Sequence, residues 1–441
     1  LISFERQLSQ KSTVGKREPI SKRGRKTCVF PWSDADGYID LVNDRKRFKK
    51  EVLTKLPRHL WGHKPGCEGK GGYRMKGFRQ NPRKTIMTGG EQRIFPIRFA
   101  KCADCGEIFS LLPSFLPREK HFCIDIIGGI LRQILLFGQS IRGAFENSAL
   151  TGRKLKSVRT IMNWIKWAGH FHPAETLIRA GVKSRGYFQE DEGFEKEPNL
   201  RTYSVVMVDS ESLLVWHMDY VDRVDEETLC GSFEKFAERI NFNVCGVTKD
   251  KWRASTKALK AVFHQIWIGF CHRHFLKKLW HALSEWRKET GCAHAQVKRA
   301  YDKMKKILAT ANSKTRLGIQ IDMERDPAFD HPAVRPVIDE LKKTAVHYTV
   351  HKRRSGIKKT TSLADNFLKI IKRKLRQAES FRDRNCTAVL FRAIANVRNF
   401  VPFMSGAKNS HKSPFMLANG MTYDLPWIQV MNVHNVFLFV E

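Results

Sequence analysis

The stretch YSVVMVDSESLLVWHMDYV, residues 203–221, decides the fold. Its two halves, Tyr203–Asp209 and Leu213–Val221, are rich in β-forming residues and are separated by a tight turn, so they predict two neighbouring strands. An extended segment, Tyr187–Phe194, precedes them. Four segments follow in alternation: a helix at Asp225–Ile240, a strand at Asn243–Thr248, a helix at Ser255–Phe263 and a strand at Gln265–Phe270. Together they predict an α/β domain with a mixed five-stranded sheet and helices.

The chain is strongly basic. It has 79 lysines and arginines against 44 acidic residues, a net charge of +35 over 441 residues. Such a charge favours a polyanionic partner, because neutralising phosphates releases the counterions condensed on nucleic acid. An anionic membrane is the rival partner, but no apolar run approaches the length of a membrane span. No charged-then-apolar leader opens the chain, although its first residue, Leu1, leaves a truncated N-terminus or a non-standard start codon open.

An acidic segment interrupts this basic chain. Between Gln189 and Glu227 lie twelve acids and only three bases. One interpretation is a solvated acidic face that balances neighbouring basic helices. The other needs only a few carboxylates at strand ends, where they bind two Mg²⁺ ions for phosphodiester chemistry. Three residues have suitable positions: Asp191 in the first extended segment, Asp250 just after a strand, and Asp365 early in a late helix.

That late helix, Ser362–Ala378, has two distinct faces. An apolar stripe contains Ala364, Phe367, Leu368, Ile371 and Leu375. Another face begins with Asp365 and continues with bases, so that a metal ligand there would face DNA phosphates. The bases that we expect to contact phosphates are Lys369, Lys372, Arg373 and Arg376. The alternative is a surface helix with scattered charge.

The order of strands, helices and acids matches the RNase H-like layout, and five segments carry a resemblance. They are QEDEGFE at 189–195, GVTKDKW at 246–252, WIGFCHRHFLKKL at 267–279, TTSLADNFLKIIKRKLR at 360–376 and ANVRNFVPF at 395–403. Over most of residues 59–430 the chain resembles the DDE transposases of bacterial insertion sequences, and more distantly the Mutator-like eukaryotic elements.

The resemblance implies metal-dependent cleavage at transposon ends, followed by strand transfer into target DNA. Asp191, Asp250 and Asp365 would hold Mg²⁺ or Mn²⁺. Cys271 and His274, from CHRH, resemble an accessory Cys-x-x-His element with a structural or DNA-contacting role. The expected partner is double-stranded DNA, at transposon ends and target, and the expected assembly is a homo-oligomer on paired ends. The expected location is the cytoplasm of a bacterium, on the nucleoid.

One departure concerns the third acid, which is normally Glu in the family. Here the sequence reads Leu363-Ala364-Asp365-Asn366-Phe367, and Asp is one methylene shorter. Glu379 is an alternative third ligand. The departure supports a rival function, a catalytically inactive or domesticated DNA-binding protein. An RNA-processing nuclease on the same fold is a third hypothesis.

A metal-binding motif precedes the catalytic segments. Cys102 and Cys105 lie three positions apart on a glycine-containing turn, and His63 with Cys67 is the nearest upstream pair. These four residues predict a structural zinc site, in which His59 could replace His63. The alternative is that the cysteines are reduced free thiols that bind no metal. The segment IRFAKCADCGEIFSLLPSFLP, residues 97–117, resembles the N-terminal zinc module of these transposases.

Two short helices, Ser140–Ala149 and Ser157–Trp167, predict a helix–turn–helix. In the second helix Arg159, Asn163 and Lys166 share the outer face, where a DNA reader would contact bases. An ordinary helical hairpin is the alternative. The predicted organisation has five parts: a basic arm at 1–58, a zinc ribbon at 59–120, a helix–turn–helix domain at 121–180, an RNase H-like catalytic domain at 181–403 with a helical insertion at about 280–350, and a tail at 404–441.

Overall fold

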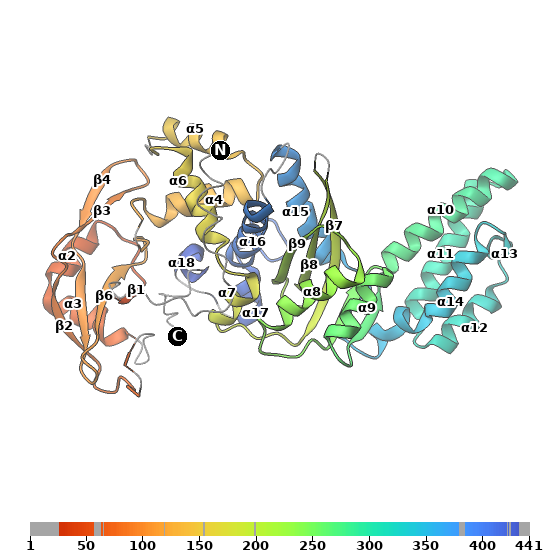
Figure 1. Ribbon diagram of the computed structural model, residues 1–441, viewed down its shortest axis with the longest axis horizontal. Helices are drawn as coiled ribbons and strands as arrows, with labels where there is room; N and C mark the ends of the chain where they lie inside the picture. The colour runs from red at the N-terminus through yellow and green to blue at the C-terminus, as the bar shows by residue number, and fades with distance from the viewer. Residues whose placement is uncertain are drawn as a thin grey trace. The chain divides into compact units, whose positions relative to one another are not determined.

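The computed structural model describes residues 26–56, 63–64, 66–118, 120–152, 155–197, 200–378, 384–420, 422 and 425–431. The chain forms two compact units (Figure 1). The first unit comprises Leu1–Arg83 and Phe95–Pro113, and the second comprises Lys84–Ile94 and Ser114–Glu441. Both combine sheets with helices, so the α/β class expected from the sequence is confirmed.

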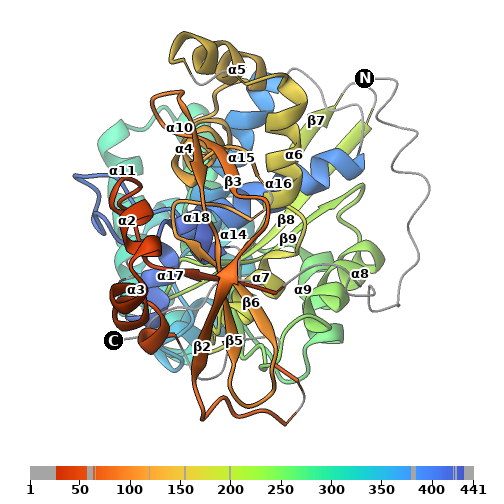
Figure 2. The same ribbon diagram turned by 90° about the vertical axis from the view of Figure 1, so that its left-hand side faces the viewer.

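The first unit is built on a four-stranded sheet with the order β1-β6-β5-β2. The strands are β1 (Lys26–Phe30), β2 (Tyr73–Phe78), β5 (Arg98–Cys102) and β6 (Ile108–Pro113). β1 runs parallel to β6, whereas β5 is antiparallel to both β6 and β2. Figure 2 shows β2, β5 and β6 fanning out from one end of this unit.

The first unit also takes in residues expected in a basic arm. Besides β1, the segment forms α2 (Gly37–Asn43), α3 (Arg45–Glu51) and a short 3-10 turn, Leu53–Lys55. Tyr38, Leu41 and Phe48 are fully buried there. They form the apolar faces of two short helices whose other residues are mostly polar or charged. Residues 1–25 and 57–58 of the expected arm lie outside the described residues.

The second unit contains a five-stranded mixed sheet with the order β11-β10-β7-β8-β9. Its strands are β7 (Tyr187–Glu197), β8 (Leu200–Asp209), β9 (Val215–Val221), β10 (Gly246–Lys249) and β11 (Trp267–Phe270). β7, β8 and β9 are antiparallel neighbours, which confirms the strand pair predicted from residues 203–221. β10 is parallel to both β7 and β11, so β10 and β11 end together, beside the middle of the longer strand β7.

Helices cover both faces of this sheet (Figure 1). On β9, His217 contacts Ser232 of α8 (Glu226–Ala237), whereas the Tyr220 ring packs against Phe391 of α16 (Arg384–Phe400). Residues 217 and 220 point to opposite faces of a strand, so α8 and α16 lie on opposite sides. The helix α9 (Arg253–Val262) packs against α8, and α15 (Ser362–Ala378) packs against β7 and β8.

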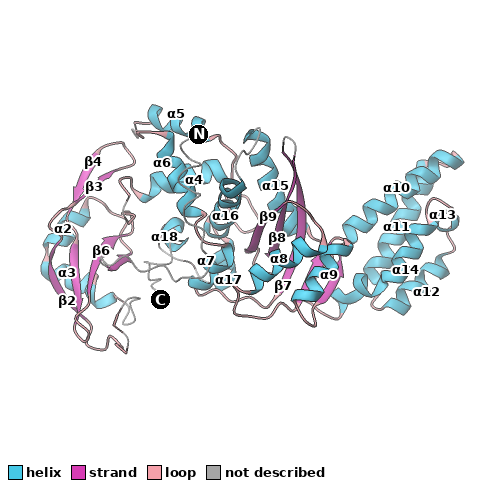
Figure 3. Cartoon of the chain, in the orientation of Figure 1, coloured by secondary structure: helices cyan, strands magenta, loops and turns pink. Residues whose placement is uncertain are grey.

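Helices also extend and brace this unit. Between β11 and α15 the chain forms only helices, from His272 to Lys352, around the predicted insertion (Figure 3). They are α10 (His272–Thr290), α11 (His294–Thr310), α12 (Lys314–Glu324), α13 (Pro327–Asp330), α14 (Arg335–Thr349) and the 3-10 turn Val350–Lys352. Two short C-terminal helices, α17 (Pro414–Asn419) and α18 (Trp427–Met431), contact α16.

The N-terminal part of the second unit is mostly helical. It consists of a two-stranded hairpin, β3 (Arg83–Ile86) with β4 (Gln92–Phe95), and the helices α4 (Ile124–Leu135), α5 (Ile141–Leu150), α6 (Val158–Ala168) and α7 (Pro173–Arg179). Asn396 of α16 fixes this part, because its Nδ2 donates to the carbonyls of Ala168 at 2.9 Å and Phe171 at 3.0 Å. Among the described residues, no helix has the length and apolar character needed to cross a membrane.

Candidate active site and metal site

Two of the three predicted catalytic aspartates lie together in the five-stranded sheet, at the point where β10 ends beside β7. In the parallel pairing of β7 with β10, Gln189 is opposite Thr248. Continuing this register by two residues places Asp250, just beyond the end of β10, beside Asp191. The strand order of the sheet therefore juxtaposes two carboxyl groups from segments 59 residues apart in sequence.

The electrostatics of Asp191 reflect this juxtaposition. Burial raises the pKa of Asp191 to about 7, and the negative charges of Glu192 and Asp250 also raise it, while His274 opposes them. Two neighbouring carboxylates that are partly removed from water repel each other and favour either a proton or a cation between them. Their oxygen donors are those that Mg²⁺ and Mn²⁺ prefer.

His274 completes this cluster from the first turn of α10. Its Nδ1 lies 3.6 Å from Oδ1 of Asp250. A hydrogen bond with Cys271 raises the pKa of His274 to about 9, and the charges of Asp250 and Asp191 add to the shift, although burial lowers it. Cys271 is buried at the N-cap of α10. The predicted accessory pair is thus adjacent to both aspartates, with His274 charged at neutral pH.

Asp365 occupies a different electrostatic setting. It lies in the first turn of α15, and its Oδ2 is 3.2 Å from both Nη1 of Arg273 and Nζ of Lys369. Among the described residues, Asp191, Asp250 and Asp365 do not form a set of ligand atoms within 4.8 Å of one another. Two bases therefore engage Asp365 in this structure, and Glu379, the alternative third ligand, lies outside the described residues.

A buried ion pair beneath the site was not foreseen from the sequence. The side chains of Lys249 and Glu190 are completely buried, with 3.8 Å between Nζ and Oε2. Lys249 Nζ also donates to the carbonyls of Asp250 at 2.6 Å and Trp252 at 3.3 Å, so it fixes the loop that carries Asp250. Burial raises the pKa of Glu190 well above its usual range. The only sequence signal was a lysine at the end of the apolar strand in GVTKDKW.

Gln189 is a second positioning residue that the sequence did not reveal. It is 2% exposed, and its Oε1 accepts a hydrogen bond from the Leu363 backbone at 2.8 Å. This contact shows that Gln189 points toward α15, and Asp191, two residues further along β7, points to the same face. Thr248 Oγ1 similarly donates to the carbonyl of Lys358 at 3.0 Å. Both contacts hold the start of α15 near the strand ends.

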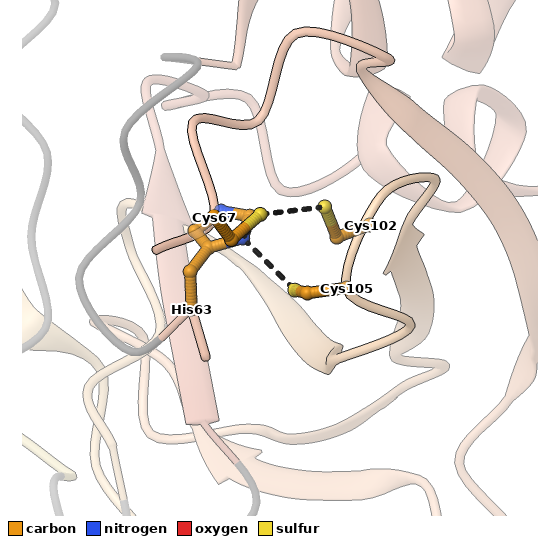
Figure 4. Close-up of side chains that lie close together, drawn as sticks. All are labelled: His63, Cys67, Cys102 and Cys105. Atoms are coloured by element: carbon orange, nitrogen blue, oxygen red, sulfur yellow. Dashed lines mark hydrogen bonds between the residues drawn. The ribbon is translucent and has the colours of Figure 1, made fainter. Parts of the chain in front are cut away.

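The four predicted zinc ligands meet in the first unit (Figure 4). Nδ1 of His63 lies 3.2 Å from Sγ of Cys105 and 3.3 Å from Sγ of Cys67, and the sulfurs of Cys67 and Cys102 are 3.8 Å apart. All four ligand atoms lie within 4.8 Å of one another, so this cluster could hold a metal such as zinc. His59, the alternative ligand, lies outside the described residues.

The surroundings of this cluster suit metal binding. The His63 Nε2 lies 2.9 Å from the hydroxyl of Tyr73, which orients the ring with Nδ1 toward the sulfurs. Burial raises the pKa of Cys105, but hydrogen bonds from the backbone at Lys64 and Glu107 outweigh it and lower that pKa to about 6. A thiol that ionises easily is a ready ligand.

The predicted DNA-contacting residues lie on two helices of the second unit. On α6, Arg159 and Asn163 are exposed and Lys166 is half-buried, while Ile161 and Ile165 face the core. On α15, Lys369, Arg373 and Arg376 are exposed and Lys372 is half-buried. These exposures agree with the faces assigned from the helical periodicity.

The neighbouring Lys374 differs from these bases. It is 4% exposed, and its Nζ donates to the carbonyl of Gln139 at 2.8 Å. Burial lowers its pKa to about 8. This lysine anchors α15 to the segment after α4, a role that the periodicity alone did not separate from phosphate contact.

One part of the chain matches a known domain family. Residues 65–150 match a domain family of unknown function, DUF6431. The match includes Cys67, Cys102 and Cys105 and ends before α6 and the five-stranded sheet. A search of curated proteins finds no match to the chain.

Proposed function

We propose that this protein is a DNA transposase of the DDE type, which cleaves DNA at transposon ends and transfers the freed strand into target DNA. The observation that carries the proposal is the juxtaposition of Asp191, in the middle of β7, with Asp250, directly after the end of the adjacent parallel strand β10. The order β11-β10-β7-β8-β9, with three antiparallel strands and two parallel additions, supports an RNase H-like catalytic core. The net charge of +35 supports a DNA partner.

In this proposal Asp191 and Asp250 hold Mg²⁺ or Mn²⁺. Such ions activate water and stabilise the leaving oxygen of a phosphodiester. His274 places a positive charge beside both carboxylates, and Lys249 fixes the backbone that carries Asp250. Asp365 would be the third ligand, and Arg273 and Lys369, which now pair with its carboxylate, would be available to DNA phosphates if a metal took their place.

The remaining parts have supporting roles. The cluster of His63, Cys67, Cys102 and Cys105 would form a zinc ribbon that contributes folding energy and no chemistry. The helices α5 and α6 would form the helix–turn–helix that reads duplex DNA, with Arg159, Asn163 and Lys166 toward the major groove. A homo-oligomer would bring two transposon ends together, in the cytoplasm on bacterial DNA.

A second candidate function is a catalytically inactive, transposase-derived DNA-binding protein. One observation favours it: the Asp365 carboxylate is paired with Arg273 and Lys369 rather than grouped with the other two aspartates. Because the Asp side chain is shorter than that of Glu, the Asp365 carboxylate would have to move further to reach a metal held by the other two aspartates. The two candidates differ only in whether metal-dependent chemistry occurs.

A cleavage assay separates these two candidates. The substrate is a duplex carrying the DNA sequences on either side of the reading frame, incubated with Mg²⁺ or Mn²⁺. Nicking by the wild type that is lost in Asp191→Asn and Asp250→Asn supports the transposase. Glu227→Gln is the matched control, because Glu227 is an exposed acid of the same segment.

Two outcomes would count against the proposed enzyme. If the wild type does not nick but Asp365→Glu restores nicking, the protein is an inactivated relative. If Asp191→Asn and Asp250→Asn nick as well as the wild type, the assignment of the active site is wrong.

A further inference from the structure

A pocket of about 400 Å³ lies within the second unit, beside the predicted recognition helix α6. The β3–β4 hairpin, residues 120–122 and α6 form its walls. A volume of this size is in the range of sites that take small organic ligands, and exceeds what a single phosphate group needs.

The walls of this pocket are fixed by the backbone. The Ile86 amide donates to the carbonyl of His121 at 2.7 Å, and the Cys123 amide donates to the carbonyl of Ile86 at 2.9 Å. At the hairpin turn, Gly90 has a φ of +87°, and a Cβ there would lie 2.1 Å from the carbonyl oxygen of Gly152. The hairpin thus packs directly on the loop that leads to α6, so the pocket is preformed.

The lining is basic. Lys84, Lys120 and Lys156 contribute to it, and no acidic residue does so among the described residues. Lys84 and Lys156 are exposed, and neither has an acidic partner within the described ranges. The Lys120 ammonium lies 5.8 Å from the centroid of the Trp167 ring, in a cation–π contact. Three positive charges around one concavity favour an anion.

A polar atom at the pocket wall lacks a partner. Thr85 is 0% exposed, and its hydroxyl forms no hydrogen bond within the described part of the chain. Thr85 lines the pocket, together with Thr160 and Asn163 of α6. A buried hydroxyl without a partner is unfavourable, so a polar ligand that reaches it would remove that cost.

We propose that this pocket binds one unpaired nucleotide of the DNA strand held by α6, an inference that rests on the proposed DNA-binding function. The three lysines take its phosphate, and Thr85 with Asn163 hydrogen-bonds the edge of its base. A concave site of this size admits a base only when the base has left the duplex stack. Asn163 would therefore serve both the outer face of α6 and the pocket.

The test measures DNA affinity by fluorescence anisotropy, without divalent metal. Two duplexes of the same sequence are compared, one fully paired and one carrying an unpaired thymidine. We expect the wild type to bind the second duplex about tenfold more tightly. Thr85→Val should abolish this preference without lowering the melting temperature, because it removes only an unpaired hydroxyl.

A charge variant and its control complete the experiment. The triple variant Lys84→Gln, Lys120→Gln, Lys156→Gln should lose the preference. Its matched control, Lys298→Gln, Lys305→Gln, Lys306→Gln, removes three exposed charges from α11 and should keep it. Equal affinity of the wild type for both duplexes, or a preference that Thr85→Val and the lysine triple leave intact, would overturn the pocket proposal alone. Failure to bind either duplex would overturn DNA binding as well.

Discussion

The two candidate metal sites of this protein differ in how complete they are. In the first unit, His63, Cys67, Cys102 and Cys105 already lie within 4.8 Å of one another. In the second unit, Asp191 and Asp250 are adjacent, while Asp365 is engaged by Arg273 and Lys369. The first set comes from the loop before β2 and the turn at the end of β5, and the second from three segments spread over 175 residues. A structural site gains stability from closed geometry, whereas a catalytic site must keep an open position.

The four residues proposed to bind zinc should give the greatest loss when one is replaced. Structural zinc contributes on the order of 10 kcal/mol of binding free energy to folding. Cys102→Ser should therefore release zinc and unfold the first unit, measured by metal content and by amide exchange over residues 66–83 and 95–113. Cys292→Ser, at a half-buried cysteine between α10 and α11, is the control. A Cys102→Ser protein with wild-type exchange would show that this cluster does not hold the unit together.

The buried ion pair below the aspartates should give the next largest effect. Lys249→Met leaves Glu190 buried without its cation, and we expect a loss of about 3–5 kcal/mol in the free energy of unfolding. Adding Glu190→Gln should restore most of this loss, because the unpaired carboxyl group is then gone. Denaturant unfolding of both single variants and the double variant measures the coupling. Additive losses would mean that the two residues do not interact.

The aspartate pair should destabilise the metal-free fold as the pH rises. The pKa of Asp191 is raised to about 7, above its unfolded value near 4, so the folded state binds more protons between these values. Stability from this residue is therefore present at low pH and is lost as the pH rises through 7. In EDTA, Asp191→Asn should be more stable than the wild type at pH 8 by up to about 4 kcal/mol, because the shift is about three pKa units at about 1.4 kcal/mol each, and about equally stable at pH 4.

Added magnesium should raise the free energy of unfolding of the wild type at pH 8 and leave that of Asp191→Asn unchanged. Equal pH profiles for the two proteins would show that Asp191 is not perturbed by its neighbours.

Gln189 should give the smallest effect. Gln189→Leu keeps the side-chain volume but removes the acceptor for the Leu363 amide, which we expect to cost about 1 kcal/mol. The loss should appear locally, as faster exchange of the Leu363 amide at the start of α15. Exchange that remains slow would indicate that other contacts hold α15 against β7.

Local patterns made much of this structure predictable. The alternation of residues 203–221 located β8 and β9, and the helix–strand alternation that follows located α8, β10, α9 and β11. The same strand order placed Asp250 beside Asp191, because β10 runs parallel to β7 and ends beside its middle. The spacing of Cys102 and Cys105 identified a ligand pair without any knowledge of the fold.

Other features depend on contacts between distant segments. β1 pairs with β6, which is 82 residues later in the chain, and a short run such as KTCVF in a basic segment gives no sign of that partner. The buried pair of Lys249 and Glu190 could not be predicted for the same reason. A charged residue in a strand is expected to be exposed unless its partner in the fold is known. The engagement of Asp365 by Arg273 requires the packing of α10 beside α15, which no local period encodes.

The most direct test of the proposed active site is to locate a divalent ion by anomalous diffraction from crystals soaked in Mn²⁺. The proposed chemistry predicts a manganese peak between the carboxyl groups of Asp191 and Asp250, which is absent from Asp250→Asn crystals. A peak that persists in that variant, or no manganese at either aspartate in the wild type, would contradict a catalytic metal site in this protein.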